Sequence, residues 1–298
     1  SSIRYTIPML PRIYLLLCVI FWGWTFVATR IVLEFISPVE LLGLRFLIGL
    51  PILYPIMRAK KISIRFSSRD RWPILLGAAI ITIHFIIQIT GLKYTTATNT
   101  GWIISITPLV MVTLSFLILK ERIGRFGLAG IAVASAGILV LVSGGRFETL
   151  DWLSSTGDWL ILASAHTWAL YTIAIRNLSR RHHPLAVTFA VLTPSAVVVI
   201  GYMALTSDWS RFLQLSPEAM IALLFLGILG MAVAHWFWQE GVAALGASRA
   251  GLFLYVEPLA TTALAVPYLG ESFTIFTAIG GLLVLAGVFI SQVRGRPG

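Results

Sequence analysis

Charged residues are scarce in this chain of 298 residues. Only 11% of them are Asp, Glu, Lys or Arg, whereas 58% are hydrophobic and the mean hydropathy is +0.91. Soluble domains usually contain about 25% charged residues, so a water-facing surface cannot be built from so few. Apolar runs long enough to cross a bilayer recur along the whole chain. The composition therefore excludes a soluble protein and predicts one that is embedded in a lipid bilayer.

Cysteine and several site motifs are also absent or nearly so. Cys18 is the only cysteine, which excludes a disulfide framework, a thiolate metal cluster and a redox pair. The sequence contains no Walker motif, and its apolar runs contain no HxxxH spacing typical of a metal site. His182 and His183 fall in a basic loop, where we expect them to be solvated. No cofactor and no metal ion is predicted.

Windows of about twenty apolar residues predict ten membrane spans in this sequence. Their approximate bounds are 12–33, 39–57, 73–92, 95–119, 124–143, 157–176, 184–206, 218–240, 247–269 and 273–293. The first run continues past twenty residues without a small-residue cleavage site, so we expect a retained span and not a signal peptide.

The net charge of +10 reflects loops between spans, not one basic face, so a nucleic-acid partner is not expected. Seventeen Lys and Arg residues lie on the side of the two termini, three lie on the opposite side, and Arg30 and Arg45 lie within spans. The positive-inside rule then predicts that both termini are cytoplasmic. We expect Arg30 and Arg45 to reach a span end or brace a helix, with binding of a carboxylate as the alternative.

An internal repeat relates the two halves of the chain. A shift of 150 residues aligns identical residue types in the pairs Gly77/Gly227, Gly91/Gly241, Gly101/Gly251, Pro108/Pro258, Glu121/Glu271 and Gly137/Gly287. Because each half has an odd number of spans, the second half enters the membrane from the opposite side. The predicted fold class is therefore all-α integral membrane, with ten transmembrane helices as two inverted five-helix repeats, residues 1–145 and 146–298, around a central cavity. We expect the paired glycines at packing sites and the paired prolines at kinks.

Polar residues within spans are costly in lipid and are candidates for a substrate pathway. His84 and Gln88 are four residues apart and share a helix face, and His235 and Gln239 repeat this spacing in the second half. Both stripes are expected to face a common cavity, with interhelical hydrogen bonds as the alternative. Glu257 lies near the middle of its span, where it would hold an amino group, carry a proton or cap the break before Pro258.

The spacing of Arg249, Phe253 and Glu257 predicts that they share one face of the ninth span, with Asn99 as the first-half counterpart of Arg249. Aromatic side chains within spans would bind a substrate by stacking and burial. The predicted cavity residues are Trp24, His84, Gln88, Asn99, Trp102, His166, Trp168, Tyr171, His235, Tyr255 and Glu257.

Two segments carry a family resemblance, namely TPLVMVTLSFLILKERIGRFGLAGIAVASAGILVLV and EPLATTALAVPYLGESFTIFTAIGGLLVLAGVFI. In each, a Pro-Leu pair starts a helix, a Glu closes it and a glycine-rich helix follows. This pattern resembles the drug/metabolite transporter superfamily, and within it the EamA-type ten-helix exporters. The stretch FWGWTFVATR looks similar to bacterial amino-acid exporters of the YddG kind, which are associated with aromatic amino acids and paraquat.

The resemblance implies a secondary transporter, and not an enzyme, that moves small metabolites by alternating access in a bacterial inner membrane. Its expected partners are a small-molecule substrate, chiefly an amino acid, and the lipid bilayer; a monomer is plausible, but the oligomeric state is left open. A multidrug or nucleotide-sugar carrier is the alternative within the superfamily. An intramembrane enzyme using His84 or His235 with Glu257, and a passive channel, are further alternatives.

Overall fold

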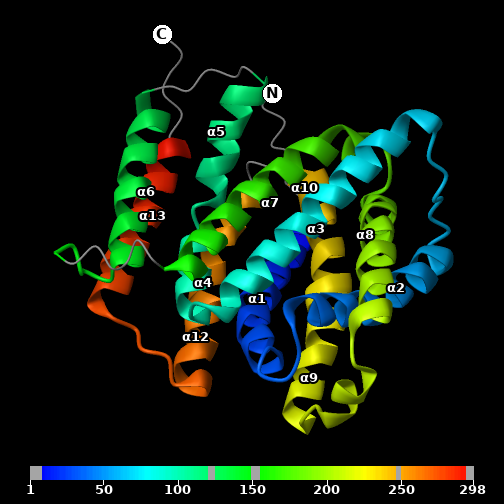
Figure 1. The fold of residues 1–298 in the computed structure, drawn as a ribbon. Helices are drawn as coiled ribbons and strands as arrows, with labels where there is room; N and C mark the ends of the chain where they lie inside the picture. The colour runs from blue at the N-terminus through cyan, green and yellow to red at the C-terminus, as the bar shows by residue number, and fades with distance from the viewer. Residues whose placement is uncertain (1–8, 120–124, 149–154, 246–249, 293–298) are drawn as a thin grey trace, which may run out of the picture.

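The computed structural model describes residues 9–119, 125–148, 155–245 and 250–292, which fold into helices without any strand (Figure 1). The first half of the chain forms α1 (Met9–Val32), α2 (Pro38–Ala59), η1 (Ser68–Asp70), α3 (Arg71–Lys93), α4 (Ala97–Ile104), α5 (Thr107–Leu119) and α6 (Arg125–Ser143). The second half forms α7 (Thr156–Arg181), α8 (Pro184–Thr206), η3 (Trp209–Gln214), α9 (Pro217–Phe225), the π-helix η4 (Leu226–Val233), α10 (Ala234–Leu245), η5 (Gly251–Val256), α12 (Glu257–Leu269) and α13 (Ile275–Gln292).

Five helical stretches are long and apolar enough to cross a membrane: Met9–Val32, Pro38–Ala59, Ser68–Lys93, Pro184–Thr206 and Pro217–Leu245. Shorter apolar helices cover Arg125–Leu141, Phe253–Leu269 and Ile275–Gly287. A helix pairs its own backbone amides and carbonyls, and this is why an apolar chain in hydrocarbon becomes helical. The structure thus has the elements of a multi-pass helical membrane protein.

The predicted fourth and ninth spans are each interrupted next to a proline. The helix α4 ends at Ile104 and α5 begins at Thr107, beside Pro108. In the second half the 3-10 helix η5 gives way to α12 at Glu257, beside Pro258. Because proline lacks a backbone N–H and its ring clashes with the preceding turn, the breaks fall at the paired prolines, as predicted. The π-helix η4, which lies within the predicted eighth span, was not predicted.

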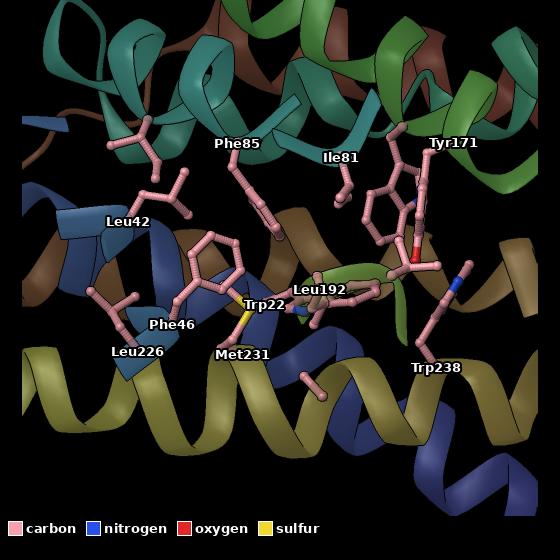
Figure 2. Packing of buried hydrophobic residues seen from close by; sticks show 14 of the residues in the cluster. Trp22, Leu42, Phe46, Ile81, Phe85, Tyr171, Leu192, Leu226, Met231 and Trp238 are labelled. Carbon is pink, nitrogen blue, oxygen red and sulfur yellow. The ribbon is translucent and has the colours of Figure 1, made fainter. Parts of the chain in front are cut away.

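The hydrophobic core lies between segments that are far apart in the sequence. The helices α3 and α7 pack together, as do α2 with α8, α1 with α10, and α6 with α13, which run side by side at one edge of the molecule (Figure 1). Figure 2 shows Phe85 of α3 pointing toward Phe46 of α2, with Met231 of η4 beside it, and Tyr171 of α7 pointing toward Trp238 of α10. The packing therefore joins the first half of the chain to the second.

The α6–α13 contact depends on small residues. A Cβ atom added to Gly137 would lie 2.7 Å from the carbonyl oxygen of Gly280, and one added to Gly287 would lie 2.4 Å from the backbone nitrogen of Ala134. Without a side chain at these positions the two backbones approach closely. The paired glycines Gly137 and Gly287 thus occupy packing sites, as predicted.

Gly23 lets α1 approach α12 in the same way. A Cβ atom added to Gly23 would lie 2.7 Å from the carbonyl oxygen of Glu257 and 3.0 Å from Oγ1 of Thr261. Thr261 donates a hydrogen bond of 3.1 Å to the carbonyl oxygen of Gly23. Gly101 of α4 approaches Thr261 from another side, at 2.8 Å for its added Cβ. The two glycines hold α1 and α4 against α12.

A carboxylate of the second half caps a helix of the first. Glu271, which follows α12, accepts hydrogen bonds of 2.8 Å each from the backbone amides of Ala97 and Thr98 at the start of α4. The first amides of a helix have no intrahelical acceptor and carry partial positive charge, so the carboxylate satisfies both. The repeat partner of Glu271, Glu121, lies outside the described residues.

A polar cluster joins the α2–α3 loop to the end of α7. Asp70, of which 1% is exposed, lies 3.0 Å from Nη2 of Arg181 and 3.0 Å from Nε2 of His182. Ser67 donates to the same carboxylate through its backbone amide and its hydroxyl. The prediction that His182 is solvated was therefore wrong, because its ring is held by a buried carboxylate.

Replacement of Glu271 by Gln is expected to lower the stability of the protein by about 1–3 kcal/mol, because at least one capping amide of α4 loses its acceptor. Glu148→Gln is the matched control, since Glu148 is exposed and makes no hydrogen bond or ion pair with the rest of the described chain. The thermal unfolding temperature of the purified protein in detergent should fall for the first variant only. Equal unfolding temperatures would contradict the capping role.

Gly23→Ala is expected to destabilise the protein by about 1–3 kcal/mol, because the added methyl group forces α1 away from α12. Gly201→Ala provides the control, since no heavy atom lies within 4 Å of a Cβ added to this glycine in α8. The control should keep or raise the unfolding temperature, because alanine favours a helix more than glycine does. If Gly23→Ala unfolds no earlier than the parent protein, the close approach of α1 and α12 is not required.

Candidate functional site

A cavity lies at the centre of the helical bundle. It encloses about 40 Å³, room for a few water molecules, because one water needs roughly 10–15 Å³ by this measure. A metabolite therefore enters only if the surrounding helices separate. The lining residues come from both halves of the chain: Trp22, Thr25, Phe26, Arg45, His84, Phe85, Gln88, Ile104, Thr107, Trp168, His235, Leu254 and Glu257.

Aromatic rings form one wall of this central cavity. The ring centroid of Trp22 lies 5.1 Å from that of Trp168 and 5.3 Å from that of His235, both in edge-on arrangements. His84 lies 5.2 Å from Trp168, and Phe85 lies 5.6 Å from His235. These rings come from α1, α3, α7 and α10, so the wall exists only when the four helices are packed together.

The π-helix η4 positions two of these rings. The backbone amide of Ala234 bonds to the carbonyl of Leu229, five residues earlier, which disrupts the usual α-helical pairing. The carbonyl oxygen of Gly230 accepts from Nε1 of Trp22 at 3.3 Å and contacts Nδ1 of His235 at 3.2 Å. Because a carbonyl only accepts, the proton of His235 is assigned to Nδ1. Nε2 of His235 is buried and has no hydrogen-bond partner among the described residues.

His84 connects α3 to α7 while its ring still lines the cavity. Its Nδ1 atom lies 3.0 Å from the carbonyl oxygen of Ser164 and 3.2 Å from Oγ1 of Thr167. Gln88, one turn further along α3, reaches the same cavity. Gln239 does not line it and instead accepts a hydrogen bond of 3.4 Å from Ser179. The two predicted polar stripes therefore differ: both residues of the first reach the cavity, but only the histidine of the second.

Two ionisable residues in this cavity come from different halves of the chain. Arg45 of α2 and Glu257 of α12 are each 4% exposed, and both line the cavity. Arg30, by contrast, donates from Nη1 to the carbonyl oxygen of Leu92 at 3.2 Å and so braces the end of α3, as predicted. Within the part of the chain that the structure describes, no hydrogen bond or ion pair joins Arg45 to the end of a span. Its guanidinium carbon lies 5.4 Å from the ring centroid of Phe85.

The structure brings five of the predicted cavity residues together and places the other six elsewhere. Those that meet at the central cavity are His84, Gln88, Trp168, His235 and Glu257. Trp24 and His166 point away from it, because positions two residues apart on a helix differ by about 200°. Trp22 and Trp168 thus face the cavity where Trp24 and His166 do not. His166 is exposed, and among the described residues its ring bonds only to the carbonyl of Leu162 in its own helix.

The remaining four do not line the cavity either. Trp102 is buried, and its Nε1 donates to Oγ1 of Thr262 at 3.1 Å. Tyr171 packs behind Trp168, with ring centroids 5.4 Å apart. Tyr255 packs against a second hydrophobic cluster, and Asn99 is half-buried near the start of α4.

The predicted alignment of Arg249, Phe253 and Glu257 on one helix face can be compared with the structure only for Phe253 and Glu257. The segment before Glu257 is the 3-10 helix η5, whose turn is tighter than that of an α-helix. Arg249 lies outside the described residues. Reasoning from the sequence left eight other lining residues out of the predicted cavity: Trp22, Thr25, Phe26, Arg45, Phe85, Ile104, Thr107 and Leu254. For the apolar and aromatic ones, the sequence does not distinguish a side chain that faces a cavity from one that faces lipid.

A second cavity of about 550 Å³ lies between α1, α9 and α12. Trp24 lines it with Val27, Ala28, Ile31, Glu218, Ile221, Ala222, Phe225, Leu264 and Tyr268. The hydroxyl of Tyr268 donates to Oε1 of Glu218 at 2.5 Å, which joins α12 to α9. Ligand pockets commonly measure about 300–1,000 Å³, so this mostly apolar cavity has room for a small molecule.

Comparison with known proteins places the chain in a family. The sequence profile of the EamA-like transporter family matches residues 9–143 and again residues 155–292. An uncharacterized transporter of Archaeoglobus fulgidus is 29% identical over 285 residues, which cover 95% of this chain and 97% of that protein. The uncharacterized transporter YyaM of Bacillus subtilis is 28% identical over 278 residues, or 92% of this chain and 90% of that protein.

A protein of Salmonella typhimurium named a probable amino-acid metabolite efflux pump is 25% identical over 289 residues, covering 93% of this chain and 92% of its own length. A solved crystal structure shares the fold with a TM-score of 0.69 at 20% identity, covering 97% of this chain and 99% of the other. The resemblance to EamA-type transporters of the drug/metabolite transporter superfamily is confirmed. Since the family profile spans most of the sequence, the chain belongs to the EamA-like transporter family of the drug/metabolite transporter superfamily and is a membrane transporter, not an enzyme.

Proposed function

We propose that this transporter is a secondary carrier that exports small metabolites, chiefly amino acids with aromatic or apolar side chains, by alternating access. The observation that carries the proposal is the central cavity, which both halves of the chain line with aromatic rings, two histidines and two opposite charges. Its volume of about 40 Å³ is too small for an amino acid, so loading requires the halves to move apart. Such a site between two mobile halves is what alternating access needs.

The helix contacts support the proposal that ten spans form two inverted halves, residues 1–145 and 146–298. When the halves are exchanged, the packing of α3 on α7 corresponds to that of α10 on α1, and both contacts are present. The packing of α4 and α5 on α7 likewise corresponds to that of α12 on α1, and the packing of α3 on α8 to that of η4 on α2. The family profile, which matches each half separately, supports the same division.

Contacts between loops support the proposed orientation, with both termini in the cytoplasm. Asp70 and Arg181, from two segments assigned to the cytoplasmic side, form an ion pair of 3.0 Å. Glu271 and Ala97, from two segments assigned to the outside, are joined by a hydrogen bond of 2.8 Å. Each contact joins segments that the charge distribution places on one side. A bacterial inner membrane is the proposed location.

The proposed substrate class has two supports. The edges and faces of Trp22, Phe85 and Trp168 surround the cavity, and such rings bind apolar and aromatic side chains. A relative that shares 25% identity over most of its length is named a probable amino-acid metabolite efflux pump.

The second cavity favours one other candidate, a multidrug carrier. Its walls are mostly apolar and aromatic, and Glu218 supplies one carboxylate at the α9 side. A lipophilic aromatic cation has matching chemistry. This candidate differs from the leading one in the ligand it predicts, so the same transport assay separates them.

The test is counterflow in proteoliposomes that contain the purified protein, with a panel of labelled amino acids and one lipophilic aromatic cation. Saturable exchange of aromatic or apolar amino acids is expected. Exchange of the cation alone would favour the multidrug candidate. The absence of exchange for every amino acid would contradict the leading proposal.

Trp168→Phe is expected to raise the KM for aromatic amino acids about 2- to 12-fold, because a smaller ring gives a weaker aromatic contact. Trp209→Phe is the matched control, since Trp209 is 48% exposed in the loop helix η3 and lies away from the cavity. An equal KM in the parent protein and the Trp168 variant would remove Trp168 from the proposed site.

A further inference from the structure

Arg45 has no anionic partner in the described chain, although its side chain is 4% exposed. Its contact is with the face of Phe85, at 5.4 Å from the ring centroid, and its Nε atom is buried without a hydrogen-bond partner. The residue lies seven positions after Pro38, the first residue of α2, and so roughly 10 Å along the helix. A side chain at this depth lies inside the bundle and lines the central cavity.

Burial of an unpaired guanidinium in a membrane is costly, and such residues normally face a partner or a water-filled pathway. The rings that surround Arg45 supply no negative charge beyond the weak attraction of an aromatic face. The planar guanidinium has five donors in a fork that matches a carboxylate. The group that best completes its surroundings is therefore a carboxylate that is not part of this chain.

Glu257 is in the converse situation on the opposite half of the chain. It is the first residue of α12, it lines the same cavity, and it is 4% exposed. Its carboxyl group makes no ion pair and no hydrogen bond within residues 9–119, 125–148, 155–245 and 250–292. Arg45 and Glu257 thus share a cavity without forming a salt bridge of 4.0 Å or less.

We propose that Arg45 binds the carboxylate, and Glu257 the ammonium group, of a zwitterionic substrate held in the central cavity. The assignment rests on the proposed carrier function and goes beyond it, because it requires both charges on one ligand. The side chain of the substrate then lies against Trp22, Phe85 and Trp168. A zwitterion adds no net charge, so the loaded cavity keeps the balance that Arg45 and Glu257 provide between them.

Ligands with only one of the two charges leave one buried group of the carrier unpaired. Loss of a hydrogen bond to a charged group lowers affinity by roughly 10- to 100-fold. An amino acid should therefore bind at least about tenfold more tightly than the matching amine or the matching carboxylic acid. A purely structural, water-bridged Arg45–Glu257 pair predicts no such preference.

The experiment measures competition against counterflow of labelled phenylalanine in proteoliposomes, with phenylalanine, phenethylamine and 3-phenylpropionate as competitors. The parent protein should be inhibited by phenylalanine at concentrations at least about tenfold below those needed for the other two. Inhibition by phenethylamine or 3-phenylpropionate at the same concentration would overturn the assignment while leaving the carrier function intact. If no substrate of the wider panel is exchanged, the proposed function itself fails.

Two variants test the residues separately. Arg45→Gln should reduce the preference for phenylalanine over phenethylamine, whereas Glu257→Gln should reduce the preference for phenylalanine over 3-phenylpropionate. Arg45→Lys and Glu257→Asp should retain part of each preference, because the charge is kept. Arg30→Gln is the control, since Arg30 braces the end of α3 and does not line the cavity.

Each Gln variant is thus expected to lose the preference over a different competitor. A purely structural role of Arg45 and Glu257 does not produce this pattern. If either variant weakens all three competitors equally, Arg45 and Glu257 stabilise the fold and do not select the substrate. Should the Gln variants fail to fold, which size-exclusion chromatography reports, the Lys and Asp variants and the parent protein decide the question. In that case either of two results would overturn the proposal: equal inhibition of the parent protein by all three competitors, or a preference of the parent protein that Arg45→Lys and Glu257→Asp both leave unchanged.

Discussion

In hydrocarbon no water is present to complete a hydrogen bond, so every polar group must find its partner within the protein or its ligand. The organisation of the central cavity follows from this constraint. Where the π-helix η4 interrupts the regular pairing, the carbonyl of Gly230 is taken up by Trp22 and His235, which fixes two cavity rings from different helices. Thr261 similarly donates to the carbonyl oxygens of Gly23 and Glu257, which secures α1 to the break at the start of α12. The irregular backbone at η4 and at the start of α12 therefore holds the helices and rings that form the cavity wall.

Close helix approach supplies the rest of the architecture. A protein in lipid gains little from burying one apolar surface against another, so helices associate where small residues allow backbone contact. Gly23 and Gly101 bring α1 and α4 to the same point on α12, and Gly137 and Gly287 bring α6 to α13. A cavity of about 40 Å³ remains between helices held so closely. Under the proposed alternating access, movement of the halves would break contacts of this kind on one side, and the glycine positions would then be central to opening.

The sequence was informative about where helices lie and poor on which way they face. The apolar runs, the breaks at Pro108 and Pro258 and the packing role of Gly137 were predicted, because chain length, proline geometry and small residues act locally. The sequence did not predict that Trp22 faces the central cavity while Trp24 faces away from it. A helix with lipid on one side and apolar neighbours on the other has no polar face to mark its orientation. The π-helix η4 and the 3-10 helix η5 also change the phase of every later residue, and periodicity assumes that no such change occurs.

The separation of Arg45 from Glu257 has a consequence for how a carrier can work. A direct salt bridge would satisfy both groups in the protein without substrate. A substrate would then have to break this salt bridge, which would reduce its net binding free energy. Two charges that share a cavity without touching leave their strongest interactions available to a ligand. Only a ligand that binds one arrangement of the halves more tightly than another changes their populations. The central cavity of about 40 Å³ is too small for a metabolite. Under the proposed carrier function, a bound zwitterion therefore favours a different arrangement of the halves from the one in the structure.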